Sequence, residues 1–576
     1  MKMLLLEAML KKTGLLPAAR AAVRWNRLLR NPAYFRQQQS LREEFVIFSR
    51  RYAAALHEPL VDPSRALPKA LVVSVGFPSG IPSELGLIRG LEAAGFAPVV
   101  LTKWDPWILK YYRLARIKNL LFWDQFIEFP NPKEIRAALD PIRSSEDLLR
   151  YENRGIRIGR FAASTALRNL RVGSLNLQSP SVRSYVEQAL VAGLMHAKAA
   201  RKILQAVIPH RALFVDRGYT PQGEMFDACL SDGIDVRTWN TGHKSNTIIL
   251  KRYTLQNRDD HPVSLSEQSW DRIRAMRWTE ADRAQIHNEF EGTYASGDWY
   301  SEVGTQFNAH AVEASEIRKR LDLNPAKKTA IIFPHILWDG TFFWGKDLFH
   351  SYQQWFLETV RAACSNTSVN WIIKIHPANT VKNARDGIQG EPAELKVIQE
   401  AIGQLPPHLF ILPANSEINT FSLLSVMDYC VTVRGTVGIE AATFGIPVLT
   451  AGTGRYDRKG FTLDSNSREQ YLDRLSHIQE FPPLTPSQRE LAERFAYGIF
   501  ICRPLELETF TLEYQKDIKA SIRTEIRARN REEWLNAPDI QAFARWINDP
   551  TQTDFLSLPS NQTEGTLNAC AALSGS

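Results

Sequence analysis

The sequence predicts an α/β protein in which two doubly wound, Rossmann-like domains face a cleft. The chain has 576 residues, enough for two globular domains with extensions, and its 44% hydrophobic and 23% charged residues are ordinary for a soluble protein. Residues 69–102 read as a strand, a helix and a strand, and residues 429–454 show the same order. In both segments a glycine-bearing loop joins the first strand to the helix, so each segment is expected to belong to its own α/β domain.

Positive charge is concentrated at the N-terminus. The chain has a net charge of +8, and residues 1–52 alone hold eleven Lys or Arg and three Glu, so the remaining residues sum to zero. A nucleic-acid-binding enzyme is expected to carry positive charge along a groove of its folded body. This distribution therefore argues against a nucleic-acid partner.

Residues 1–57 are predicted to form a basic amphipathic segment. Within it, residues 17–29 place Ala18, Ala21, Ala22, Trp25, Leu28 and Leu29 on one helical face and Arg20, Arg24 and Arg27 on the other. Such a helix suits either an anionic membrane surface or a site on its own domain, and both interpretations stay open. The first predicts that residues 1–30 bind the inner face of the plasma membrane.

The compartment is predicted to be the cytoplasm. Glu7 and the Lys11–Lys12 pair interrupt the apolar run that a secretion signal needs, and no run approaches the roughly 18 apolar residues of a membrane-spanning helix. The five cysteines are odd in number, widely spaced and free of any C-x-x-C pair. This usage indicates a reducing compartment and no structural zinc.

Residues 69–260 are predicted to form the first Rossmann-like domain. The loop from Gly76 to Gly80 does not match G-x-G-x-x-G, so a dinucleotide site is not supported. Later strands at 212–216 and 236–239 end in polar loops. Ligands bind outside the carboxyl ends of parallel strands, so these loops should face the cleft.

A helical connection is predicted over residues 261–326, and residues 327–480 should form the second Rossmann-like domain. The paired aspartates within 257–260 imitate a metal-binding motif, but they lie in a polar loop with no strand before it, so no metal site is predicted. The second domain opens with a strand at 329–333 and an aromatic loop at 334–345. This loop either lines the cleft, where its rings can stack on a sugar, or plugs the space between the domains.

Two loop tips of the second domain predict a phosphate-binding site. A strand at 371–375 leads into Lys374, His376 and Pro377, and a strand at 430–433 leads into a glycine loop and a helix. A glycine loop that opens a helix directs free N–H groups and the positive end of the helix dipole at one point, which favours a phosphate. The residues expected to contribute are Lys374, His376, Arg434, Gly435, Thr436, Gly438 and Glu440.

Arg434 and Glu440 have expected roles in binding, and the glycines and Glu440 also have a structural alternative. Arg434 would add a fixed positive charge, and Glu440, one turn into the helix, would accept hydrogen bonds from ribose hydroxyls. Alternatively, the glycines only permit close packing of helix on strand, and Glu440 only complements the helix dipole. The two tips should lie at one edge of the sheet, and this coincidence favours the ligand interpretation.

The K-I-H-P run at 374–377 and the R-G-T-V-G-I-E-A-A-T-F-G-I-P-V run at 434–448 resemble the donor domain of GT-B glycosyltransferases. Within these, the chain is most similar to the bacterial capsule polysaccharide biosynthesis group, which includes Kdo transferases, and more distantly to polysialyltransferases. The resemblance covers about residues 329–465 and is weaker over 69–255. It implies that His376, Gly435 and Thr436 contact the nucleotide and phosphate of a donor. It also implies that helices in 481–550 cross back over the first domain, and residues 551–576 have the composition of a disordered tail.

The resemblance further implies that a general base comes from the acceptor side of the cleft. Asp216 and His243 follow strands of the first domain and are the first and second candidates, and Asp339 in the aromatic loop is a third. Each must come within about 2.6–3.2 Å of the attacking hydroxyl. Capping of a helix by Asp216 and closure of a turn by His243 are the structural alternatives.

Together these features predict a metal-independent glycosyltransferase. It would move a sugar from a CMP- or UDP-linked nucleotide-sugar donor to a capsule or other surface polysaccharide or to a lipid-linked acceptor. No cofactor beyond this co-substrate is expected. The alternatives are a nucleotide-sugar epimerase-like enzyme, which uses a similar two-domain cleft, and a non-catalytic polysaccharide-assembly protein that retains the fold.

Overall fold

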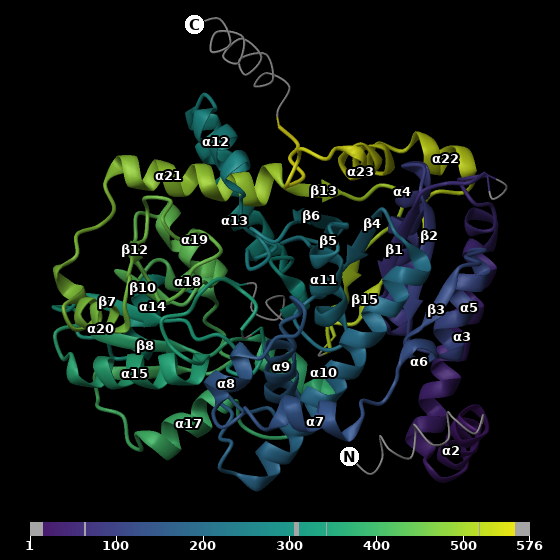
Figure 1. Ribbon diagram of the computed structural model, residues 1–576. Coiled ribbons are helices and arrows are strands. Elements are labelled where there is room, and N and C mark those ends of the chain that lie inside the picture. The colour runs from purple at the N-terminus through teal and green to yellow at the C-terminus, as the bar shows by residue number, and fades with distance from the viewer. Residues whose placement is uncertain (1–14, 63–64, 304–309, 341, 518, 559–576) are drawn as a thin grey trace, which may run out of the picture.

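The computed structural model describes residues 15–62, 65–303, 310–340, 342–517 and 519–558, and within them two separate sheets form two α/β domains (Figure 1). The first domain lies on the right of the figure and the second on the left. Most neighbouring strands in both sheets are parallel. The predicted fold class, α/β with two Rossmann-like doubly wound domains, is confirmed.

The first sheet has the strand order β13-β6-β5-β4-β1-β2-β3. Parallel pairing sets Val73 of β1 beside Leu101 of β2 and Phe214 of β4. The strand order reverses between β1 and β4, so the loops that follow these two strands diverge and leave a crevice at the carboxyl edge. The strands are β1 (Lys69–Val73), β2 (Ala97–Thr102), β3 (Leu120–Phe122), β4 (Arg211–Phe214), β5 (Asp235–Thr241), β6 (Thr247–Tyr253) and β13 (Pro504–Glu506).

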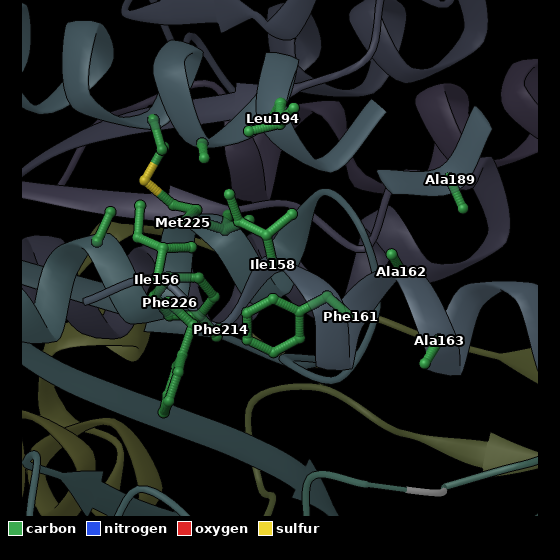
Figure 2. Packing of buried hydrophobic residues seen from close by; sticks show 14 of the residues in the cluster. Ile156, Ile158, Phe161, Ala162, Ala163, Ala189, Leu194, Phe214, Met225 and Phe226 are labelled. Carbon is green, nitrogen blue, oxygen red and sulfur yellow. The ribbon is translucent and has the colours of Figure 1, made fainter. Parts of the chain in front are cut away.

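Helices cover both faces of this sheet: α4 (Ile81–Ala93), α5 (Pro106–Leu114), α6 (Trp123–Phe126), α7 (Pro132–Leu139), α8 (Ser145–Arg150), α9 (Ile158–Leu170), α10 (Pro180–Val207) and α11 (Gln222–Ser231). Figure 2 shows Phe161 of α9 beside Phe214 of β4 and Phe226 of α11. The rings of Phe214 and Phe226 meet edge to face at 5.6 Å. A Cβ on Gly223 would collide with the Phe161 ring, so a glycine is required where α11 approaches α9. This packing fixes the ends of α9 and α11 beside the crevice.

The second sheet has the order β12-β11-β10-β7-β8-β9, and its order reverses between β7 and β10. The strands are β7 (Thr329–Ile332), β8 (Asn370–Lys374), β9 (Leu409–Leu412), β10 (Tyr429–Thr432), β11 (Val448–Thr450) and β12 (Leu463–Asp464). The helices are α14 (Ala314–Arg320), α15 (Tyr352–Ser365), α16 (Ala378–Asp386), α17 (Ala393–Ala401), α18 (Thr420–Leu423), α19 (Thr436–Thr443) and α20 (Arg468–Ser476). A second crevice therefore opens at the carboxyl edge between β7 and β10.

The chain crosses between the domains twice. It passes from the first to the second through α12 (Glu267–Ala275), α13 (Glu280–Ser296) and the short turn Ser301–Val303, and it returns through α21 (Pro486–Tyr497) and the helical turn Gly498–Cys502 (Figure 1). After this return β13 pairs antiparallel with β6, and β14 (Glu513–Tyr514), β15 (Ile522–Arg523), α22 (Arg531–Asn536) and α23 (Pro538–Asn548) follow. The ring of Phe543 fills the space that a Cβ on Gly90 of α4 would need, so α23 packs closely on the first domain.

Residues 551–558 correct part of the predicted disordered tail. Asp554 is buried, and its carboxylate accepts a hydrogen bond from the Lys251 ammonium at 2.9 Å and another from the Ser266 backbone N–H at 2.7 Å. Although burial opposes ionisation, the charges of Lys251 and Arg503 hold the pKa of Asp554 well below its usual range. The rest of the predicted tail, 559–576, lies outside the described residues.

The N-terminal segment forms two helices, α2 (Leu16–Arg30) and α3 (Pro32–Leu56), and residues 1–14 lie outside the described part. The second half of α3 packs on α5, where the Phe48 and Tyr111 rings lie 5.1 Å apart. By contrast, α2 leaves Trp25 63% and Leu29 81% exposed. Among the described residues, no helix combines the length and apolarity needed to span a bilayer.

Candidate active site

The predicted loop tips lie at one edge of the second sheet, around its switch point. The Arg434 backbone N–H, after β10, donates a hydrogen bond to Nε2 of His335, after β7, at 3.3 Å. The His335 ring stacks on Tyr352 at 4.8 Å. Burial, the charge of Arg434 and the neighbouring His376 imidazole, which follows strand β8, lower the pKa of His335 well below its usual value. The imidazole tip and the glycine loop therefore border the same crevice.

The glycine loop is held rigidly by the segment that follows β11. Arg455 donates from Nη1 to the Arg434 carbonyl at 3.1 Å and from Nη2 to Oγ1 of Thr436 at 2.8 Å. The Tyr456 hydroxyl donates to the Gly435 carbonyl at 2.8 Å, and a Cβ on Gly438 would collide with that hydroxyl. Gly435 precedes the first turn of α19 without a side-chain cap. The Gly438 N–H donates to the Gly435 carbonyl at 3.0 Å, which leaves the Thr436 and Val437 N–H groups to hold an anion.

Arg434 organises this loop rather than offering its terminal nitrogens to a ligand. Its side chain is buried, Nη1 donates to the Tyr352 hydroxyl at 3.2 Å, and Nη2 forms an ion pair with the Asp347 carboxylate. Burial raises the pKa of Asp347 although the charge of Arg434 opposes the shift. The positive charge of Arg434, predicted to be free for a phosphate, is therefore paired with Asp347 in the loop between β7 and α15.

His376 is arranged as a neutral hydrogen-bond donor. Its Nδ1 accepts a hydrogen bond from the Ala378 backbone N–H at 3.2 Å, which leaves the proton of the neutral ring on Nε2. Burial and the positive charges of Lys382 and Lys374 lower the pKa of His376 to about 4. Near pH 7 the ring is therefore neutral, and Nε2–H is available to a phosphate oxygen.

Lys374 and Glu440 are both buried, and each has a protein partner. The Lys374 ammonium donates to the Pro413 carbonyl at 3.0 Å, and burial lowers the pKa of Lys374 to about 8. Glu440 accepts a hydrogen bond from the Tyr294 hydroxyl of α13 at 2.7 Å, and burial raises its pKa to about 7. The phosphate contact of Lys374 and the ribose contact of Glu440 stay predictions.

A cavity of about 510 Å³ occupies the crevice of the first sheet. Asp216 follows β4 and lines it with Arg168 and Asn169 of α9 and with Asn240 and Thr241 of β5. Oδ1 of Asp216 accepts hydrogen bonds from the backbone N–H groups of Arg217 at 2.6 Å and Gly218 at 3.0 Å. These two bonds fix the carboxylate at the cavity wall, as a general base requires.

His243 is not at the cleft, which corrects its assignment as a candidate base. The side chain is 0% exposed, its Nε2 pairs with the Glu289 carboxylate at 2.6 Å, and its ring packs on Trp299 and Phe500. Burial lowers the pKa of His243 despite the opposing charge of Glu289. The turn it closes belongs to the core between β5 and α13.

Asp339 bridges the two domains, and its contacts disfavour the predicted role as a base, which no observation tests. Oδ1 accepts a hydrogen bond from the Tyr219 hydroxyl of the first domain at 2.6 Å, and Oδ2 forms an ion pair with Lys382 of α16. Burial opposes ionisation, but Lys382 and Arg168 hold the pKa of Asp339 well below its usual range. A carboxylate of such low basicity is a poor proton acceptor at neutral pH.

Three residues of this region were missed by sequence reasoning: His261, Tyr300 and His335. His335 follows β7 as His376 follows β8, so its place after a predicted strand was a usable signal. His261 and Tyr300 lie in the predicted connection, where no local pattern marks them. The His261 backbone N–H donates to the Gly454 carbonyl at 2.8 Å, next to Arg455, which contacts the glycine loop. Burial and the charges of Arg455, Arg434 and Arg217 lower the pKa of His261 well below its usual value.

Comparison with known proteins supports the resemblance. Residues 286–480 match the family model of capsule polysaccharide biosynthesis proteins. The protein FixF of Sinorhizobium fredii (strain NBRC 101917 / NGR234) is 31% identical over 123 residues, 21% of this chain and 25% of FixF, so the match spans a quarter of that relative's length.

Solved structures align with this chain at low identity and low TM-score. Two Thermosulfurimonas dismutans KpsC structures, a beta Kdo 2,4 transferase and a beta Kdo 2,7 transferase, are 14% and 12% identical. The alignments cover 51% and 58% of this chain and 81% and 87% of those chains, with TM-scores of 0.29 and 0.31. At TM-scores below 0.5 these likenesses carry no argument about fold or function. The resemblance to capsule polysaccharide biosynthesis proteins that the donor-domain motifs predict is therefore confirmed over residues 286–480.

Proposed function

We propose that this chain is a glycosyltransferase of capsule or surface polysaccharide synthesis, which moves a sugar from a nucleotide-sugar donor to a glycan or lipid-linked acceptor. One observation carries the proposal. His376 and the glycine loop present hydrogen-bond donors at one edge of the second sheet, and a cavity lined by the Asp216 carboxylate occupies the switch point of the first sheet. The Tyr219–Asp339 hydrogen bond joins the two domains between the two sites.

In the proposed reaction the acceptor hydroxyl oxygen attacks the anomeric carbon of the donor sugar, and its proton passes to Asp216. The bond from that carbon to the phosphate oxygen breaks, and the phosphate departs with the electron pair. Nε2–H of His376 and the N–H groups at the start of α19 stabilise the charge that appears on the phosphate. These donors would do the work that a divalent cation does in other transferases, so the proposed mechanism uses no metal.

A nucleotide screen tests the proposal. We expect one of CMP, UDP, GDP and CDP to stabilise the protein by about 2.7 kcal/mol at 100 times its Kd, measured as a rise in Tm. His376→Ala should abolish this rise, and His477→Ala, an exposed histidine of the same domain, should leave it unchanged. No rise with any of the four would contradict the proposal. Turnover of the donor sugar without any acceptor would favour the epimerase-like alternative.

The proposal includes association with the inner face of the plasma membrane through residues 1–30. Exposed Trp25 and Leu29 on the basic helix α2 support it. We expect the full chain to cosediment with vesicles that contain phosphatidylglycerol, and binding should weaken as salt is raised. Deletion of residues 1–30 should release the protein, and equal binding to pure phosphatidylcholine vesicles would contradict the electrostatic part. Retained binding after the deletion would reject the membrane role of this segment.

A further inference from the structure

Tyr300 is held in an unfavourable backbone conformation between the two domains. Its φ is +42°, in the left-handed region that residues with a Cβ rarely adopt. The conformation is fixed from both sides, because the Tyr300 backbone N–H donates to the His243 carbonyl at 2.7 Å and its ring meets Trp299 edge to face at 5.3 Å. The left-handed conformation of Tyr300 costs free energy, and these two contacts hold its side chain in one direction.

The Tyr300 hydroxyl is buried, and its hydrogen-bonding neighbour among the described residues is the Thr436 hydroxyl, whose oxygen already accepts from Nη2 of Arg455. The Tyr300 hydroxyl is inaccessible to solvent, and among the described residues it makes no hydrogen bond of good geometry. Arg455, Glu302 and Glu440 are its charged neighbours, and Thr436 of α19 lies beside it. Burial raises the pKa of Tyr300 to about 12, so the hydroxyl keeps its proton and can donate it. Burial of a hydroxyl without a well-formed hydrogen bond costs free energy, so we expect this hydroxyl to bind a ligand.

The same place holds unsatisfied donors. Nε of Arg455 and Nε of Arg434 are both buried and lack a partner among the described residues. The terminal nitrogens of Arg455 bind the Arg434 carbonyl and the Thr436 hydroxyl, so these groups surround the start of α19. A cluster of N–H and O–H donors that lack well-placed acceptors is complementary to an anion with several oxygens.

We infer that Tyr300 is a ligand-binding residue of the donor site, and that its hydroxyl donates a hydrogen bond to a phosphate oxygen of the nucleotide bound at the start of α19. The inference rests on the proposed function. It assigns a donor contact to the crossing segment between the domains, outside the second Rossmann-like domain that carries the predicted donor residues.

The test compares Tyr300→Phe with Tyr471→Phe. Tyr300→Phe should weaken binding of the preferred nucleotide about 10- to 100-fold by titration calorimetry, because a hydrogen bond to a charged group is lost. The Tm of the free protein should stay equal or rise, because the hydroxyl it removes makes no hydrogen bond of good geometry. Tyr471→Phe should do the opposite, since the Tyr471 hydroxyl accepts the Trp355 indole N–H at 2.9 Å in the core: its Tm should fall and its nucleotide affinity should not change.

Three outcomes would overturn the inference, and they are distinguishable. If the wild-type protein binds none of CMP, UDP, GDP and CDP, the proposed function fails and the assignment of Tyr300 fails with it. If the wild type binds a nucleotide and Tyr300→Phe binds it equally well, only the assignment fails. Equal weakening of a nucleoside and its phosphorylated form by Tyr300→Phe would also reject the phosphate contact.

Discussion

Asp216→Asn is expected to lower the rate of glycosyl transfer about 100- to 10,000-fold and to leave nucleotide affinity unchanged. Asparagine keeps the size of the side chain and its Oδ1 can still accept from the Arg217 and Gly218 N–H groups, so the loop should keep its shape. The amide cannot take a proton from an acceptor hydroxyl. The loss should therefore fall on the chemical step and not on the donor site in the other domain.

The measurement is transfer of labelled sugar to a membrane or polysaccharide extract, from the donor whose nucleotide gives the largest thermal shift. Asp232→Asn serves as the matched control, because Asp232 is an exposed aspartate of the same domain whose partner is the surface residue Arg201. Full activity of Asp216→Asn would remove Asp216 from the reaction. A parallel loss of the nucleotide shift would mean that the substitution damages the fold.

Arg434→Met is expected to lower the free energy of unfolding by about 3 kcal/mol, because it leaves the Asp347 carboxylate, whose side chain is only 18% exposed, without its counter-ion. The loss should be larger at pH 8 than at pH 5.5. Burial already raises the pKa of Asp347, and removal of the opposing guanidinium raises it further. A carboxyl whose folded-state pKa lies above its unfolded value contributes stability at low pH that is lost as pH rises through the folded pKa.

Denaturant unfolding at the two pH values measures this effect. The double variant Arg434→Met with Asp347→Asn should recover part of the lost stability, since it removes the unpaired charge. Arg361→Met, at an exposed arginine of α15 in the same domain, should change stability by less than about 0.5 kcal/mol. If the loss of unfolding free energy does not depend on pH, or if the double variant does not recover stability, the Arg434–Asp347 ion pair is not the cause of the destabilisation.

The strands and their loop tips were predictable because both signals are local. Apolar runs such as 69–73 and 370–374 identify buried strands, and parallel strands in a doubly wound sheet bring their carboxyl ends to one edge. The placement of Asp216 and His376 followed from this rule alone. The rule gives the position of a residue and says nothing of its partners.

The pairing of side chains far apart in the sequence was not predictable. His243 and Asp339 both follow strands, as a catalytic residue would, but Glu289 and Lys382 engage them from helices distant in the chain. Asp554 sits in a segment with the composition of a disordered tail, yet it pairs with Lys251, which precedes it by about 300 residues. Composition gives the average tendency of a segment to be disordered. A single buried ion pair can nevertheless hold that segment in one place.

The double crossing of the chain means that the first domain is assembled from two distant pieces of sequence. Its sheet takes six strands from residues 69–253 and the seventh, β13, from residues 504–506. In a fragment that stops before α21, β6 would lack its partner β13 and could pair with strands of other molecules. The buried Lys251 ammonium would also lack its counter-ion, Asp554. The first domain can therefore be expressed alone only as a circular permutant or together with the C-terminal segment that supplies β13 and Asp554. A simple truncation before α21 is expected to aggregate.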